Sequence, residues 1–415
     1  MAEKKRSWYS VIAPGILLAA TGVGAGDLMT SGLAGSALGL SVIWTVVIGA
    51  ILKWVLSEGI ARWQLATGTT MLEGWSWKLG GWIRWVFFIY LTLFAVVVGG
   101  ALTSACGVAG AGLAPLSDDP ATSRIIWGVL HSAAGVLLVL RGSFRSFEIM
   151  MSALVGLMFV TVISAAVAIG PDWSAVAAGL VPSIPAGGVD WVIALLGGVG
   201  GTVTLLSYGY WIAESGRRGL TDVPVCRIDL AVGNGMTALF GIAVVILGSN
   251  VELEGRGAML ALKFAEQLRE PLGAAGSWVF LIGFWGAVFS SLLGVWQSIP
   301  YLFADFLDLQ SGREPGVRTE LDLRTGKPYR TAVLFIATVP LVFLWAPVEA
   351  VQILYGVFGA LFLPLLSLTL LILNNRRRWV GSDFLTPWAI NLMLGASLVF
   401  FVYLSADSLW TRYGW

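Results

Sequence analysis

Long apolar segments recur along the whole chain and constrain its fold more than any other feature. Each is roughly 20 residues long or more, which is the length that a helix needs to cross a hydrocarbon layer about 30 Å thick. Of the 415 residues, 57% are hydrophobic and only 12% are charged, a composition foreign to soluble domains. About eleven such segments lie near residues 11–35, 38–62, 82–110, 123–141, 147–170, 190–214, 228–249, 277–306, 330–346, 348–374 and 386–406. The sequence therefore predicts an all-α polytopic membrane protein.

The charges between these segments predict how the protein is oriented. Lysine and arginine are concentrated in alternate loops, beginning with the N-terminal segment, and cytoplasmic loops are the ones that carry such an excess. We therefore expect the N-terminus to be cytoplasmic. We expect the chain to cross a cell membrane, plasma or inner, several times. The net charge of +1 gives no indication of nucleic-acid binding. The expected surroundings are the lipid bilayer, and we expect a monomer.

Two of the apolar segments are interrupted by glycines, one at residues 22–27 (GVGAGD) and one at residues 197–204 (GGVGGTVT). Membrane helices are unwound only where the freed backbone groups face protein, a water-filled cavity or a ligand. Interrupted helices in matching positions of two halves point to the binding site of a secondary transporter. Asp27, at the end of the first interruption, is for this reason the most informative residue of the chain.

The order of the spans indicates an internal repeat. Residues 11–170 and 190–374 each hold five spans and each begin with an interrupted helix, and an extra helix follows near 386–406. An odd number of spans gives the two units opposite orientations in the membrane. This is the 5+5 inverted repeat of the LeuT-type fold, in which substrate binds near the midplane where the two first helices break. We expect residues 1–415 to form a single transmembrane transporter domain.

Four short strings add a resemblance to a known family. They are Ala13–Ala20 (APGILLAA), Leu180–Pro185 (LVPSIP), Gly197–Val203 (GGVGGTV) and Arg227–Asp229 (RID). In this order they resemble the Nramp family of divalent metal transporters, which carries G-P-x-F-L-x-S, V-P-x-x-P and G-A-x-V strings. The resemblance extends from Pro14 to Arg378. It implies a LeuT-like fold of eleven or twelve helices and the transport of a divalent metal cation, which is then a substrate and not a cofactor.

The chain departs from the family at the metal motifs. Where the family has D-P-G-N, this chain has Gly24–Asp27 (GAGD), and where the family has M-P-H it has Thr204–Leu206 (TLL). The thioether and the imidazole are therefore missing, while a carboxylate and a hydroxyl remain. Oxygen ligands suit Mg²⁺-like ions better than soft transition metals. Residues 87–110 of the third span contain no carboxylate, so the resemblance does not carry over the family's proton coupling.

The candidate ligands surround the two interruptions. Asp27 is expected to contact the cation, because an intramembrane carboxylate is costly and functional by default; its alternative role is to cap the following half-helix. Gly24 and Gly201 offer backbone carbonyls, or else serve close helix packing. Thr204 and Ser207 offer hydroxyl groups, although membrane Ser and Thr often bond their own i−4 carbonyl.

Three further residues complete the candidate site. Gln352 lies near a family position where a glutamine approaches the metal. Tyr208 follows the second interruption and either narrows the cavity as a gate or simply packs. Glu58 is an i,i+4 neighbour of Arg62 and is expected to pair with it.

Lys53 lies deep in the second span and needs a partner. It either neutralises a carboxylate such as Asp27 when the site is empty or extends along its stem to the inner interface. Neutralisation would suit an anionic or zwitterionic substrate.

Two functions follow from these observations. The first is a transporter that moves a divalent cation by alternating access, without proton coupling and with a preference for hard ions. The alternative is a LeuT-fold transporter of a small organic solute such as an amino acid. An enzyme is not expected, because the sequence contains no nucleophile–base set, no phosphate-binding loop and no cofactor motif.

Overall fold

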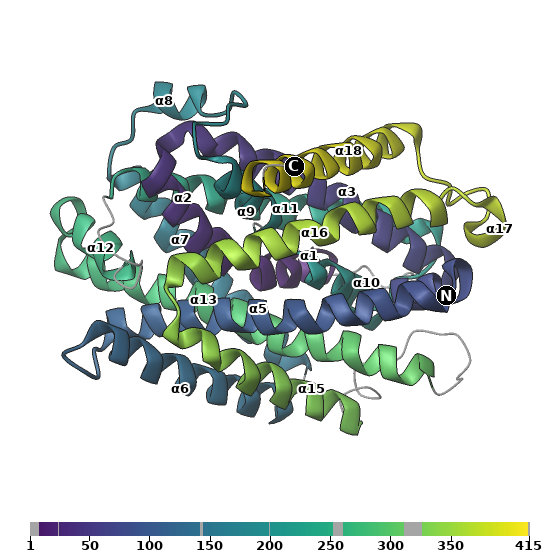
Figure 1. Cartoon of the computed structure of the whole chain (residues 1–415), viewed down its shortest axis with the longest axis horizontal. Coiled ribbons are helices and arrows are strands. Elements are labelled where there is room, and N and C mark those ends of the chain that lie inside the picture. The colour runs from purple at the N-terminus through teal and green to yellow at the C-terminus, as the bar shows by residue number, and fades with distance from the viewer. Residues whose placement is uncertain are drawn as a thin grey trace.

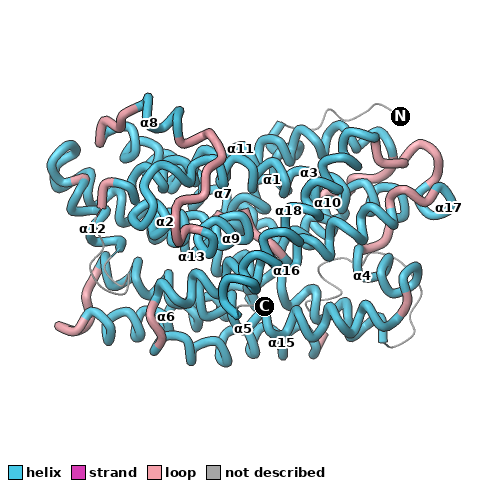
Figure 2. The backbone as a smooth tube through the Cα atoms, turned by 45° about the horizontal axis from the view of Figure 1, so that its top comes forward, coloured by secondary structure: helices cyan, strands magenta, loops and turns pink. Residues whose placement is uncertain are grey.

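The computed structural model describes residues 8–23, 25–141, 144–198, 200–251, 260–310 and 326–413. In these ranges the chain is helical and contains no β-strand. The long helices lie side by side along the longest axis of the molecule (Figure 1). Helices α8 (Trp173–Ala178) and α12 (Leu260–Gln267) lie at one end of this bundle and α17 (Arg377–Val380) at the other. The loops that join the long helices gather at the two ends of the bundle (Figure 2).

The first five predicted spans are present as helices, and the first is broken. It consists of α1 (Trp8–Gly22), the short π-helix η1 (Ala25–Thr30) and α2 (Ser31–Leu38). A 3₁₀ turn, η2 (Gly39–Val42), then leads into the second span. The other four spans and the turns after the second are α3 (Ile43–Thr67), α4 (Met71–Gly74), η3 (Trp75–Leu79), α5 (Gly81–Leu113), α6 (Pro120–Arg141) and α7 (Phe144–Ala168).

The second five spans again begin with a broken helix. It consists of α9 (Val189–Gly198), η4 (Val203–Leu206) and α10 (Ser207–Glu214). After η5 (Leu220–Asp222) follow α11 (Val223–Ser249), α13 (Arg269–Gln310), α15 (Lys327–Thr338) with η6 (Val339–Trp345), and α16 (Val348–Leu373). The extra helix is α18 (Trp388–Tyr413).

The described helices agree with the predicted number of spans. Nine are long and apolar enough to cross a membrane, and two shorter apolar helices cover Ile12–Gly22 and Trp388–Tyr403. The stretch Asp27–Thr67 contains the second half of the first span together with the whole second span. The short helix Ile12–Gly22 supplies the missing first half, so the set corresponds to the eleven predicted segments.

Small residues bring the first broken helix onto α11. A Cβ atom added to Gly15 would lie 2.3 Å from the carbonyl oxygen of Asp229, and one added to Gly35 would lie 2.5 Å from that of Val245. The contact is made from the other side as well, because a Cβ on Gly248 would lie 2.3 Å from the carbonyl oxygen of Gly32. In lipid, helices associate largely through such close backbone packing. Both halves of the first span are therefore fixed against one helix of the second unit.

The second broken helix has an equivalent contact with α16. A Cβ on Gly356 would lie 2.5 Å from the carbonyl oxygen of Ala194, and one on Gly197 would lie 2.0 Å from that of Gly356. Nothing larger than hydrogen fits at either glycine without moving a backbone. The position of α9, and hence of the break that follows it, depends on this contact.

We expect Gly356→Ala to destabilise the protein, because the new methyl group forces α16 away from α9. Overpacking of this kind costs about 1–3 kcal/mol, so thermal unfolding of the detergent-solubilised protein should begin at a lower temperature. The control is Gly156→Ala on α7, where an added Cβ meets no atom within 4 Å. Equal melting temperatures for the two variants would contradict this account of the α9–α16 contact.

Candidate functional site

The two breaks meet inside the bundle. Gly200 and Gly201 follow α9 with φ angles of 71° and 77°, in the left-handed region that glycine adopts without strain. A Cβ on Gly22, at the end of α1, would lie 2.5 Å from the carbonyl carbon of Gly200. Glycine is thus needed at residues 200 and 201 for the backbone conformation, and at Gly22 for the close approach of the two segments. The two unwound segments cross at this point.

Asp27 joins the two segments. It lies in η1, its side chain is 0% exposed, and its Oδ2 accepts a hydrogen bond of 3.0 Å from the backbone N–H of Gly200. The other oxygen, Oδ1, is buried and has no hydrogen-bond partner among the described residues. Buried polar atoms are nearly always paired. Asp27 therefore has one oxygen that holds the crossing together and one that is available to a ligand.

Lys53 lies at the same crossing. It comes from α3, is 0% exposed, and its Nζ donates a hydrogen bond of 3.0 Å to the carbonyl oxygen of Gly197. Its ammonium group interacts electrostatically with Asp27. The alternative in which Lys53 extends to the membrane interface is therefore wrong. The charge of this lysine is buried at the crossing.

The other predicted ligands lie around this crossing with different environments. Thr204 lies in η4 next to Gly201, whose added Cβ would be 2.6 Å from the threonine Oγ1. Ser207 begins α10, and its hydroxyl is buried without a hydrogen-bond partner in the described chain. Gly24 lies outside the described residues. Thr202, which the sequence analysis missed, has a buried hydroxyl of the same unpartnered kind.

Gln352 lies near the start of α16. Its Nε2 donates a hydrogen bond of 2.9 Å to the carbonyl oxygen of Ala101 on α5, while its Oε1 is buried and has no partner among the described residues. One turn further along α16, Tyr355 interacts electrostatically with Asp27. Gln352 thus belongs to the helix that contacts η1, although no hydrogen bond joins its side chain to Asp27 in the described part of the chain.

The composition of the site limits which ions it can hold. No group of three or more His, Cys, Asp and Glu side chains within reach of one ion exists among the described residues. A cation at Asp27 would therefore complete its shell with backbone carbonyls, hydroxyls or water. Such all-oxygen shells are characteristic of hard ions.

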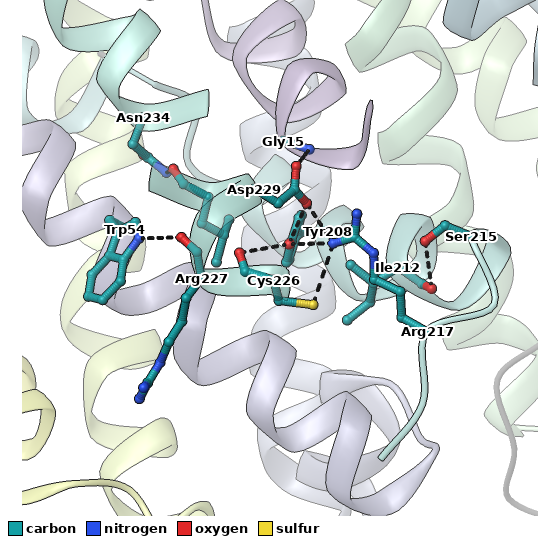
Figure 3. Close-up of polar contacts among 11 residues, drawn as sticks. Gly15, Trp54, Tyr208, Ile212, Ser215, Arg217, Cys226, Arg227, Asp229 and Asn234 are labelled. Carbon is teal, nitrogen blue, oxygen red and sulfur yellow. Dashed lines mark hydrogen bonds and ion pairs between the residues drawn. The ribbon is translucent and has the colours of Figure 1, made fainter. Parts of the chain in front are cut away.

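A second buried acid, Asp229 on α11, is the centre of a network of hydrogen bonds and one ion pair (Figure 3). Its Oδ1 accepts a hydrogen bond of 2.6 Å from the backbone N–H of Gly15. Its Oδ2 accepts one of 2.7 Å from the hydroxyl of Tyr208 and one of 2.8 Å from Nη1 of Arg217. The side chains of Asp229 and Arg217 are 0% and 1% exposed. The network joins α1, α10 and α11 at one end of the bundle.

Asp229 belongs to one of the strings that carry the family resemblance, and its sequence context alone did not assign it to a site. An aspartate inside an apolar span was the available signal, since such residues are functional by default. Tyr208, expected to narrow the cavity, is completely buried and bonded to Asp229. Its gating role stays a prediction.

The expected pair of Glu58 and Arg62 is confirmed. Glu58 also forms an ion pair with Arg227 on α11, in which Oε1 of Glu58 lies 2.9 Å from Nη2 of Arg227. Glu58 therefore links α3 to α11 and is fully engaged by two arginines. This leaves it without a free oxygen for a cation, so its place in the candidate site is structural.

Comparisons with known proteins bear on the whole chain. A family model described as "Nramp: Natural resistance-associated macrophage protein-like" matches residues 15–411. The metal transporter Nramp6.2 of Populus trichocarpa is 25% identical over 327 residues, which are 74% of this chain and 58% of that protein. The chain spans less than two thirds of the length of the curated relatives that it matches.

Two solved structures share the fold. The manganese transporter of Eremococcus coleocola, in complex with an aromatic bis-isothiourea substituted compound, is 18% identical, with a TM-score of 0.74 over 99% of this chain and 89% of that chain. MhsT in complex with L-phenylalanine is 15% identical, with a TM-score of 0.63 over 98% and 99% of the two chains. At these identities the likeness establishes the LeuT-type architecture and no more.

We expect Asp229→Asn to destabilise the protein strongly, because it leaves the guanidinium of Arg217 buried without its counter-charge. Removing one partner of a buried ion pair costs about 3–5 kcal/mol, which chemical or thermal unfolding in detergent would measure. The exposed Asp118→Asn is the matched control and should stay within about 0.5 kcal/mol.

A double variant, Asp229→Asn with Arg217→Met, tests whether this loss comes from the pair itself. Because the two side chains share one interaction, the double variant should lose less stability than the sum of the two single variants. If the stability losses of the two single variants simply add in the double variant, the loss in Asp229→Asn does not come from its ion pair with Arg217.

Proposed function

This chain belongs to the Nramp family, and from that premise we propose that it is a transporter that moves a divalent metal cation across a cell membrane. We place the cation at Asp27, where the two broken helices cross. The observation that carries the proposal is the free Oδ1 of Asp27, which is buried beside the unwound segments and has no hydrogen-bond partner in the described chain. A membrane transporter, and not an enzyme, is what the family membership implies.

The remaining ligands of the proposed site are neutral oxygens. Among the described residues, the candidates are the backbone carbonyl of Gly201, the hydroxyls of Thr204 and Ser207, and the free Oε1 of Gln352. The carbonyl of Gly24 is a candidate from the sequence alone. With a single carboxylate and no sulfur, the site would favour a Mg²⁺-like ion, or bind several divalent ions with little discrimination.

The site is closed to solvent in the described conformation, because the side chain of Asp27 is completely buried. A cation would reach it only after half-helices move. The natural pivots are the breaks themselves, where backbone hydrogen bonding is already interrupted. We therefore propose alternating access by movement of α1 and α9–α10 about the crossing.

Proton coupling through the third span is not part of this proposal. Helix α5 carries no Asp, Glu, His or Lys between residues 87 and 110, so this stretch offers no carboxylate, imidazole or amine to carry a proton.

A second candidate function is supported by the pair of Asp27 and Lys53. Opposite charges that are both buried at the crossing and interact electrostatically suit a zwitterion, whose amine would meet Asp27 and whose carboxylate would meet Lys53. A small amino acid is the corresponding substrate. Binding of an amino acid that is independent of divalent ions would favour this alternative.

We expect Asp27→Asn to lower divalent-cation flux at least tenfold, because it removes the only carboxylate of the proposed site. The measurement uses purified protein in liposomes loaded with a Mg²⁺- or Mn²⁺-sensitive dye. The control is Asp383→Asn, which removes an exposed carboxylate of a loop. Flux that is unchanged by Asp27→Asn would exclude this residue as a ligand.

A pH-sensitive dye in the same liposomes tests the absence of proton coupling. The liposomes contain a weak buffer and no uncoupler. During uptake driven by a cation gradient, their internal pH should stay constant. A pH change that follows the cation and disappears in Asp27→Asn would mean that protons move with the metal.

A further inference from the structure

The proposed site already contains a cation. The ammonium group of Lys53 is fully buried at the crossing and interacts electrostatically with Asp27, the residue whose free oxygen we assign to the metal. We propose that Lys53 is a tethered competitor of the transported cation, which neutralises Asp27 in the empty site and is displaced when the cation binds. This inference rests on the proposed function.

The geometry holds the lysine where it competes. Its stem crosses the second break, since a Cβ on Gly200 would lie 3.3 Å from the lysine Cδ. Its Nζ bonds the carbonyl oxygen of Gly197, in the last turn of α9. The same Gly200 donates its N–H to Asp27. Lys53 and Asp27 are therefore anchored to residues three apart in the second broken helix.

The other charged groups nearby are paired with one another. Glu58, farther along α3, is held by Arg62 and Arg227. On α11, Asp229 is held by Arg217. Asp27 is the carboxylate with which the ammonium group of Lys53 interacts electrostatically.

The charge balance gives the consequence. With Lys53 charged, the empty site is neutral, and a bound divalent ion would raise its net charge to +2 in a buried environment. Without the lysine, the empty site carries −1 and the same ion raises it only to +1. Like charges at short distance repel strongly where water is excluded, so the lysine weakens cation binding. A carbonyl that Lys53 vacates, that of Gly197, would at the same time become available as a further oxygen ligand.

The test compares the binding of Mn²⁺ and Mg²⁺ to the full chain in detergent, measured by isothermal titration calorimetry. We expect Lys53→Met, which keeps the apolar stem and removes the charge, to lower Kd at least tenfold. Lys53→Arg keeps the charge and should bind no more tightly than the unaltered chain. Lys78→Met, on an exposed side chain of η3, is the matched control and should leave Kd unchanged.

Lys53→Gln guards against a variant that fails to fold. Its amide retains a donor for the carbonyl of Gly197 without the charge, so it should also tighten binding. If the unaltered chain binds the ions and neither neutral variant binds them more tightly, the inference about Lys53 is wrong while the proposed function stands. If no variant binds either ion, the metal-transport proposal fails and this inference fails with it. Loss of amino-acid binding in Lys53→Met would instead support the zwitterion alternative.

Discussion

The hydrogen bond from the Gly200 N–H to Asp27 joins the two places where membrane helices give up their own backbone pairing. In a bilayer each freed N–H or C=O needs a partner from the protein or a ligand. Here the first broken helix supplies a carboxylate and the second supplies an amide, while Lys53 takes up the carbonyl of Gly197. Charged side chains thus pair with two of the freed backbone groups of the crossing. The atoms that stabilise the crossing are therefore also the atoms of the candidate binding site.

The surrounding helices keep this crossing in place through close backbone contacts. Gly15 and Gly35 bring the first span onto α11, and Gly197 and Gly356 bring α9 onto α16. Such contacts need small residues, and 52 of the 415 residues are glycine. Apolar bulk alone would not position the helices, because lipid tails are as apolar as the side chains that they would replace.

Two of the buried aspartates, Asp27 and Asp229, show two ways of keeping an acid inside the bundle. Asp229 accepts hydrogen bonds at both oxygens and an ion pair from Arg217, so its carboxylate is fully occupied. Asp27 has the charge of Lys53 nearby but keeps Oδ1 free of hydrogen bonds in the described chain. A saturated carboxylate favours structure, and an unsaturated one favours ligand binding. On this distinction the two acids have different roles within one fold.

The sequence alone determined the spans and the two interruptions and singled out Asp27 as a candidate, because hydropathy and glycine position are local properties of the chain. It also determined the pair of Glu58 and Arg62, which are neighbours on one helix. The partners of Lys53, Asp229 and Tyr208 were decided only by the tertiary structure. Some of these contacts join spans that are distant in the chain, such as α3 with α9 or α1 with α11, and the bond of Tyr208 to Asp229 joins the consecutive helices α10 and α11. Their geometry depends on how separate helices pack, and no spacing within a single helix encodes it.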